Sequence, residues 1–113
     1  MKNTFVIKKN FEFKKLFSKG KFYRGKAINI YIKENNKDYN KFGVCVSKKQ
    51  GKAVHRNHIK RLIRESYKNL ESTIKTGYSF VVIINKNIDI KKVSYYDVKE
   101  DFENILKNGG YII

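Results

Sequence analysis

Arginine is scarce in this sequence, and its placement is the first indication of chemistry. Lysine and arginine together number 26, yet only four are arginine, and three of those, Arg56, Arg61 and Arg64, fall within nine residues. A guanidinium group is planar and presents paired N–H donors that match two phosphate oxygens at once. A chain that uses lysine almost everywhere else and clusters arginine here is typical of a phosphate-binding site.

The arginines belong to a segment whose apolar spacing predicts a helix over residues 53–70. Ile59, Leu62 and Ile63, followed by Leu70, recur at helical intervals and form one apolar face. The other side carries a polar stripe of Arg56, Asn57, Lys60, Arg61, Arg64 and Lys68. Like charges four residues apart destabilise a free helix by roughly 0.2–0.5 kcal/mol per pair, and an ordinary solvated face mixes signs. The stripe therefore predicts a polyanionic ligand that relieves the repulsion.

The basic stripe continues upstream into a short loop. Lys48, Lys49 and Lys52 precede the helix, and Gly51 lies among them. A glycine lets backbone N–H groups approach a phosphate closely, and the helix N-terminus adds the positive end of its dipole. We therefore expect loop and helix to form one continuous binding surface.

The charge of the whole chain is unevenly distributed. Residues 1–68 hold 20 basic and 4 acidic side chains, whereas residues 69–113 hold 6 of each, so the first part carries the entire formal net charge of +16. Such a surface favours a nucleic acid over a membrane surface or a merely solvated charge excess. The longest apolar run, from Phe80 to Ile84, is too short to cross a bilayer. The single cysteine, Cys45, cannot form an internal disulfide, and we expect a cytoplasmic protein that contacts no membrane.

The residue types that would support catalysis by the protein itself are poorly placed. Most acidic residues follow residue 70, and no paired carboxylates lie among the basic residues. His55 and His58 are three apart on the predicted helix, without an evident third ligand. We therefore assign no catalytic residue and no metal site to the protein.

Hydropathy patterning predicts the elements that position these residues. Ile28, Ile30 and Ile32 alternate with polar neighbours as in a half-buried strand, Asn10 is placed to cap the first helix, and Ser94 with Asp97 resembles a capping box. The expected elements are a helix over 10–18, strands over 27–33 and 42–47 paired as an antiparallel hairpin, the helix over 53–70, a strand over 78–84 buried on both faces, and a last helix from 94. We predict an α+β fold (an α/β sandwich) in one nucleic-acid-binding domain over residues 1–113. Its small, mainly antiparallel sheet has about four strands and three helices, in the order α-β-β-α-β-α with room for one short extra strand.

At this point the sequence resembles a known family. The run V-S-K-K-Q-G-K-A-V-H-R-N-H-I-K-R-L-I-R-E, from Val46 to Glu65, is similar to the signature of the bacterial ribonuclease P protein subunit. The matching positions are Ala53, Val54, Arg56, Asn57, Lys60, Arg61, Arg64 and Glu65. The segment N-F-E-F-K-K-L-F-S-K-G resembles the family's opening helix. The chain departs from the family at His58, where an arginine is usual, and at Gly77, where an acidic residue is frequent.

The resemblance implies two RNA-binding surfaces. The catalytic RNA of ribonuclease P would contact the basic loop and helix, and a cleft would hold the single-stranded 5′ leader of precursor tRNA. Phe13 and Phe17 would line this cleft from the first helix, and Tyr31 and Ser47 from the sheet. Aromatic rings stack on unpaired bases with roughly 1–3 kcal/mol each. Spacing alone favours core packing for the two phenylalanines, and both interpretations stay open.

The resemblance also implies where the chemistry resides. The chain would be the protein subunit of an endonuclease that matures the 5′ end of tRNA, with hydrolysis carried by the RNA and by Mg²⁺ bound mainly to the RNA. No further protein partner would be required. The family contains a rare left-handed β-α-β crossover, whose hand the sequence does not determine. The competing interpretations are a ribosomal protein, a helix-turn-helix DNA binder and a self-contained ribonuclease.

Overall fold

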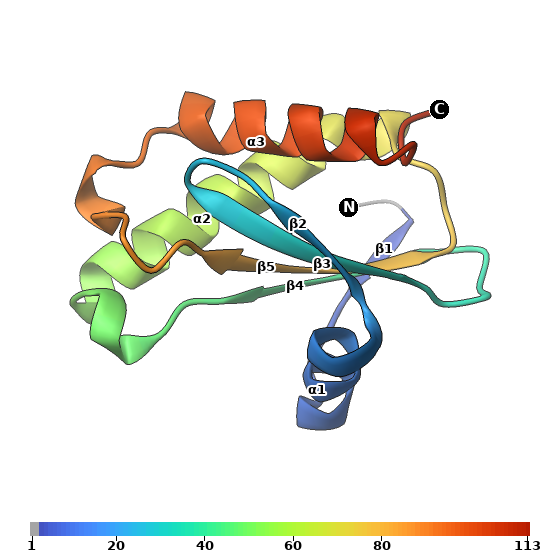
Figure 1. Ribbon diagram of the computed structural model, residues 1–113, viewed down its shortest axis with the longest axis horizontal. Coiled ribbons are helices and arrows are strands. Elements are labelled where there is room, and N and C mark those ends of the chain that lie inside the picture. The colour runs from blue at the N-terminus through green and yellow to red at the C-terminus, as the bar shows by residue number, and fades with distance from the viewer. Residues whose placement is uncertain (1–2) are drawn as a thin grey trace.

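The computed structural model describes residues 3–113 as a mixed sheet with helices on both faces (Figure 1). The first two residues of the domain predicted over 1–113 lie outside the described residues. The order is β1 (Thr4–Val6), α1 (Asn10–Lys19), β2 (Lys21–Arg24), β3 (Ile28–Glu34), β4 (Asn40–Cys45), α2 (Ala53–Leu70), β5 (Tyr78–Ile84) and α3 (Tyr95–Asn108). The described residues also form three short 3-10 turns, at Lys48–Gln50, Glu71–Thr73 and Ile90–Lys92. Helix α1 covers one face, and α2 and α3 cover the other.

The sheet corrects the predictions of about four strands, of mainly antiparallel pairing and of the element order α-β-β-α-β-α. Within residues 3–113 it has five strands in the order β1-β4-β5-β3-β2, with β1–β4 and β4–β5 parallel and β3–β5 and β2–β3 antiparallel. The predicted hairpin of residues 27–33 with 42–47 is therefore wrong, because β5 lies between β3 and β4. The physical reason is that the apolar run of β5 needs neighbours on both edges and cover on both faces, as the centre of a sheet provides.

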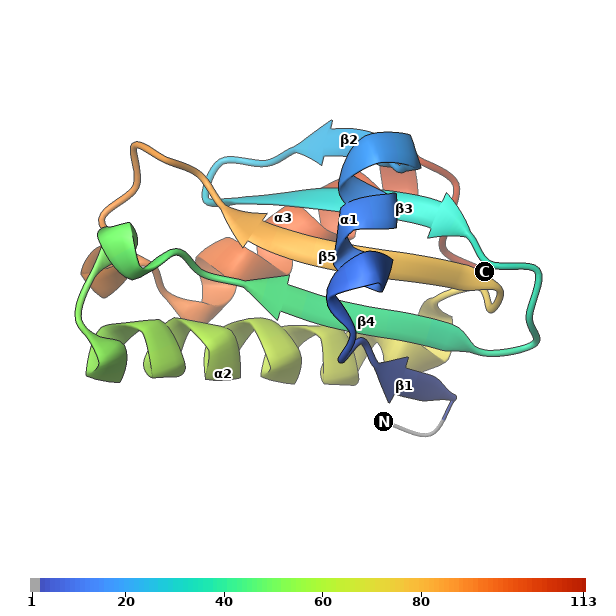
Figure 2. The same cartoon turned by 90° about the horizontal axis from the view of Figure 1, so that it is seen from below.

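The connection from β4 through α2 to β5 is left-handed. In Figure 2, β4 and β5 both run to the left with β5 above β4, and α2 lies on the face of the sheet turned away from α1. Seen from the side of α2, with both strands pointing up, β5 lies to the left of β4, which makes the crossover left-handed. Crossovers between parallel strands are nearly always right-handed, so this arrangement is rare. It places α2 along the β4 side of the sheet.

Most of the core lies between the sheet and the helices α2 and α3. Phe42 and Tyr67 stack there with ring centroids 4.2 Å apart. The apolar stripe of α3, formed by Val98, Phe102, Ile105 and Leu106, is also buried there. A second, smaller core of Ile7, Leu16 and Val81 lies under α1. The predicted bounds of α2 and the capping box of Ser94 with Asp97 are confirmed. Asn10, predicted to cap α1, is instead its first helical residue, and the side chain of the preceding Lys9 makes no capping hydrogen bond.

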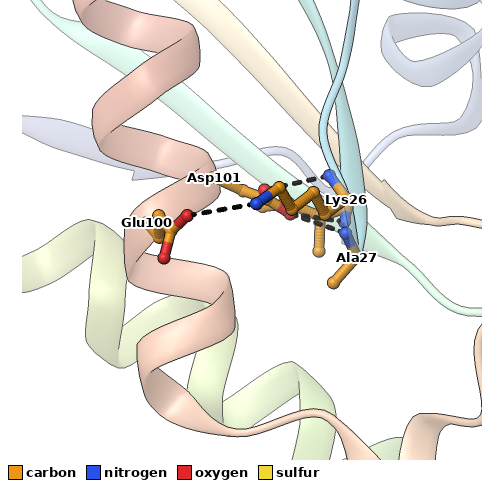
Figure 3. Close-up of polar contacts among 5 residues, drawn as sticks. Lys26, Ala27, Glu100 and Asp101 are labelled. Carbon is orange, nitrogen blue, oxygen red and sulfur yellow. Dashed lines mark hydrogen bonds and ion pairs between the residues drawn. The ribbon is translucent and has the colours of Figure 1, made fainter.

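A buried carboxylate fastens α3 to the turn between β2 and β3 (Figure 3). Asp101 is 4% exposed, and its two oxygens accept hydrogen bonds from the backbone N–H groups of Lys26, Ala27 and Ile28 at 2.9, 2.8 and 3.0 Å. A Cβ atom on Gly25 would lie 2.6 Å from the Asp101 carboxyl carbon, so the turn requires glycine there. Across the turn, the Asn85 amide donates to the carbonyl oxygens of Gly25 and Lys26. The start of β3 is thus held from two sides.

None of the helices within residues 3–113 combines the length and the hydropathy needed to cross a bilayer.

Candidate nucleic-acid interface

The orientation of α2 follows from its apolar face. Ile59 and Ile63 are fully buried against the sheet, Tyr67 is 1% exposed, and Leu62 and Leu70 pack half-buried against the same core. The polar stripe therefore points outward, as predicted. Arg61, Arg64 and other members of the stripe keep their side chains in solvent, which leaves them free to bind phosphate oxygens.

A shallow hollow runs along this outward face. Its lining consists of Asn57, Lys60, Arg61, Arg64, Glu65 and Lys68. Five of the predicted RNA-binding residues of the helix are thus brought together around one depression. Glu65 is the acidic residue beside them, four positions after Arg61. The open shape suits the backbone of a nucleic acid rather than an enclosed small molecule.

Arg56 differs from the other arginines of α2, because it also holds the preceding loop. Its Nη1 atom donates a hydrogen bond of 2.6 Å to the carbonyl oxygen of Gly51, and its side chain is half-buried. Gly51 has a φ of +154°, and a Cβ atom there would lie 2.9 Å from the Ile90 side chain. The predicted RNA contact at Arg56 is therefore combined with a structural role in fixing the loop.

The basic loop is shaped by a capping box rather than by its lysines. The Ser47 hydroxyl accepts from the Lys49 backbone N–H at 3.2 Å, and the Gln50 side-chain oxygen accepts from the Ser47 N–H at 3.2 Å. This pair fixes a single 3-10 turn whose lysines, Lys48 and Lys49, are exposed, and Lys52 at the start of α2 is exposed as well. Ser47 thus determines the shape of the loop.

A larger hollow of about 1080 Å³ lies between α1 and the carboxyl ends of β4 and β5. Phe13 and Ser47, two of the residues predicted for the leader cleft, both line it, together with Cys45 and Ile83. The Phe13 ring fits here because position 43 is glycine, where a Cβ atom would lie 2.7 Å from the ring. Lys49 and Lys60 also line this hollow. Since Lys60 also lines the hollow on α2, the two surfaces are continuous.

Phe17 and Tyr31, the other two predicted cleft residues, do not line this hollow. They belong to an exposed aromatic cluster on the α1 side, where Tyr31 contacts Phe17 edge-on at 5.1 Å and Phe22 at 5.0 Å between ring centroids. Phe17 is 40% and Phe22 47% exposed. The exposed faces of Phe17 and Phe22 are open to stacking with unpaired bases.

Three residues of the cleft and of the aromatic cluster were not predicted from the sequence. Lys14 and Lys86 line the cleft from α1 and from the loop after β5, and Phe22 completes the aromatic cluster. Lys14 directly follows Phe13, so its position could have been read from the helix pattern. Lys86 is more than seventy residues away in sequence, and no local signal marks it.

The donor set of the cleft does not fit a divalent cation held by the protein. Among the described residues that line it there is no aspartate or glutamate, whereas Mg²⁺ in proteins is bound through one or more carboxylates. In residues 3–113, no group of three or more histidine, cysteine, aspartate or glutamate side chains is arranged to hold a metal ion.

Cys45 offers a direct reporter of this cleft. Burial raises the pKa of its thiol, while the nearby Lys60 ammonium acts in the opposite direction and lowers it. Since the thiolate is the reactive form, we expect alkylation by iodoacetamide at pH 8 to be slower than for a free cysteine, and its rate to rise with pH up to the raised pKa. Lys60→Ala should slow the reaction further by removing the lowering charge. Single-stranded RNA in the cleft should protect the thiol, and unchanged labelling by mass spectrometry at saturating RNA would contradict this placement.

Comparison with known proteins gives consistent results. The family model Ribonuclease P matches residues 1–109. The ribonuclease P protein component of Clostridium botulinum (strain 657 / Type Ba4) is 42% identical over 105 residues, which is 92% of this chain and 93% of that protein. That of Clostridioides difficile (strain 630) is 38% identical over 102 residues, 89% of this chain and 88% of the other.

Solved structures show the same fold. The Staphylococcus aureus RNase P protein superposes with a TM-score of 0.82 at 32% identity, covering 96% of this chain and 97% of that chain. The Thermotoga maritima RNase P protein superposes with a TM-score of 0.82 at 30% identity, covering 91% and 96%.

Proposed function

The chain belongs to the ribonuclease P protein family, and on this premise we propose that it binds the catalytic RNA and the 5′ leader of precursor tRNA. Members of the family are protein components of the ribonuclease P endoribonuclease. The exposed face of α2 with the loop before it would contact the catalytic RNA. The cleft between α1 and the sheet would hold the leader while the RNA removes it.

The observation that carries this proposal is the continuity of the two surfaces. The hollow on α2, with Arg61 and Arg64, and the cleft, with Phe13, share Lys60, and Lys49 also lines the cleft. One surface thus presents bidentate donors for a structured RNA backbone, and the other presents the Phe13 ring and lysines for an unpaired strand. A protein with both, joined at one residue, can hold a catalytic RNA and the flexible end of its substrate next to each other.

The residues of the chain support binding rather than bond cleavage. The described lining of the cleft contains lysines, neutral polar and apolar side chains and the ring of Phe13. None of its ionisable groups is a carboxylate that could act as a general base or as a metal ligand. Hydrolysis would be carried by the RNA subunit with Mg²⁺ bound mainly to the RNA. The lysines would lower the Mg²⁺ concentration needed, because they screen phosphate repulsion between catalytic RNA and substrate. The reaction would take place in the cytoplasm, without a further protein partner.

The test is reconstitution at low Mg²⁺ and moderate salt, with 5′-labelled precursor tRNA. We expect little cleavage by the catalytic RNA alone, none by the protein alone, and cleavage at the mature 5′ end when both are present. Phe17→Ala should weaken binding of precursor tRNA roughly fivefold or more, because one stacking surface for an unpaired base is lost. Binding of mature tRNA, which has no leader, should not change.

Two outcomes would contradict the proposal in different ways. If the protein leaves cleavage by the catalytic RNA unchanged at low Mg²⁺, its basic surface serves a different RNA, as in a ribosomal protein. If the purified protein cleaves precursor tRNA without the RNA subunit, the chemistry resides in the chain. A thermal unfolding transition shared by Phe17→Ala and the unaltered protein excludes misfolding as the cause of any loss.

A further inference from the structure

Helix α1 divides its face of the sheet into two halves, and the proposed leader cleft occupies only one of them. Figure 2 shows α1 lying across the strands, with the carboxyl ends of β4 and β5 on one side of it and their amino ends on the other. On the second side, a separate hollow of about 370 Å³ lies between α1, the end of β3 and the start of β4. We call it the distal hollow.

The distal hollow is cationic. Among the described residues its lining includes Lys9, Lys15, Lys33, Lys37 and Lys41. Two carboxylates, Glu12 and Glu34, also line it, and the Glu12 carboxylate is already paired with the Lys41 ammonium at 2.7 Å. Lysines therefore remain in excess, and they come from both walls, since Lys15 lies on α1 and Lys37 on the loop between β3 and β4.

The same hollow has aromatic rings that the core does not use. Phe11, on its lining, is 63% exposed, and the Lys9 ammonium lies 5.8 Å from its ring centroid. Tyr39, opposite, is half-buried and meets Phe5 edge-on at 4.9 Å, and Phe5 is 60% exposed. Exposed rings among lysines are the composition of surfaces that bind single-stranded nucleic acid, where bases stack and lysines follow the backbone.

Adjacent residues of α1 connect the two halves. Lys14 lines the leader cleft and Lys15 lines the distal hollow, and both are exposed. A strand that leaves the cleft across the outside of α1 therefore meets cationic side chains without a gap. The distal hollow has lysines and no arginine in its described lining, which suits loose contact with successive phosphates rather than bidentate recognition of one.

We propose that the distal hollow is a second subsite for single-stranded RNA, which takes up leader nucleotides upstream of those in the cleft. This inference rests on the proposed function, because the same strand must first occupy the cleft. It makes a specific demand: only substrates whose leader is long enough to cross α1 gain affinity from the subsite.

The test measures the affinity of the reconstituted holoenzyme for precursor tRNAs of increasing leader length. For the unaltered protein, affinity should rise in two steps, the first as the cleft fills and the second as the strand passes α1. Lys15→Ala with Lys37→Ala should abolish the second step and leave the first. With long leaders, the slope of log affinity against log salt should fall by roughly 1.4, because each phosphate contact to a single strand contributes about 0.7. Phe11→Ala should weaken long-leader binding roughly fivefold or more.

The matched control is Lys91→Ala with Lys107→Ala, which removes the same charge from exposed positions that line neither hollow. It should leave both steps intact. Loss of the second step in this control as well would show that net charge alone is responsible and would overturn the proposal. So would an unaltered protein with no second step, or a Lys15/Lys37 variant that retains it. Short-leader affinity reports on the proposed function separately, because it depends on the cleft alone.

Discussion

Simultaneous replacement of Lys60, Arg61 and Arg64 by alanine is expected to weaken binding of the catalytic RNA about a hundredfold or more. These side chains line the hollow on α2. If each contributes about 1 kcal/mol through charge-assisted hydrogen bonds to phosphate, their loss sums to about 3 kcal/mol, which corresponds to roughly a hundredfold change in the dissociation constant. The slope of log affinity against log salt should fall by about 2–3 because three phosphate contacts are lost.

The same variant is expected to be more stable than the unaltered protein. Arg56, Lys60, Arg64 and Lys68 follow one another at intervals of four along α2. Replacing Lys60 and Arg64 removes three like-charge pairs, each of which destabilises a helix by about 0.2–0.5 kcal/mol. Alanine is also the residue most favourable to a helix. Tighter folding together with weaker RNA binding is the result that distinguishes a binding surface from a structural one.

Urea unfolding and RNA titration measure the two quantities on the same samples. The control is Lys75→Ala, Lys91→Ala and Lys107→Ala, which lowers the net charge equally at exposed positions outside the hollow. It should change affinity far less. Equal losses in both variants would mean that the RNA responds to the overall charge and that α2 is not the contact. Arg56 is left in place because its bond to Gly51 would confound the measurement.

The parts of this molecule that the sequence predicted well are those determined by neighbours along the chain. The bounds of α2 were predicted correctly because its apolar and charged positions repeat over five turns. The cap of α3 depends on Ser94 and Asp97 alone, so it could be predicted from the sequence equally well. The outward stripe of cations follows from the same periodicity, so the α2 surface could be predicted residue by residue.

Strand pairing was predicted less well, because it depends on competition between distant segments. The sequence shows that β5 is apolar on both faces but not that it separates β3 from β4. The strands β1 and β2 were missed because one has three residues and the other is mostly exposed. The residues of the cleft were likewise only partly predicted. Phe13 and Ser47 were identified through the family resemblance, whereas Lys86 is brought to the cleft by the topology of the sheet.

Asp101 shows how a contact between residues distant in sequence supports the aromatic cluster on the opposite face of the sheet. Nothing in the sequence around Asp101 indicates that it binds a turn more than seventy residues earlier in the chain. Yet its carboxylate binds three backbone N–H groups at the turn that leads from β2 into β3 (Figure 3). Strand β2 carries Phe22 and β3 carries Tyr31, whose rings lie 5.0 Å apart in the exposed aromatic cluster. The carboxylate on one face of the sheet thus helps to position aromatic rings on the other.

Asp101→Ala is therefore expected to lower the free energy of unfolding by about 3–5 kcal/mol, since a buried group with several charge-assisted hydrogen bonds leaves its donors unsatisfied when it is removed. Asp101→Asn should cost less, because its remaining oxygen can keep the bonds from Ala27 and Ile28, which share one carboxylate oxygen. Glu100→Ala, next in sequence, removes only the exposed ion pair with Lys26 and should have little effect. Urea unfolding should show this order at an unchanged m-value. If Asp101→Ala proves as stable as Glu100→Ala, the turn is held by Asn85 alone. If it unfolds early but binds the leader normally in the folded range, the aromatic cluster does not depend on the position of β2.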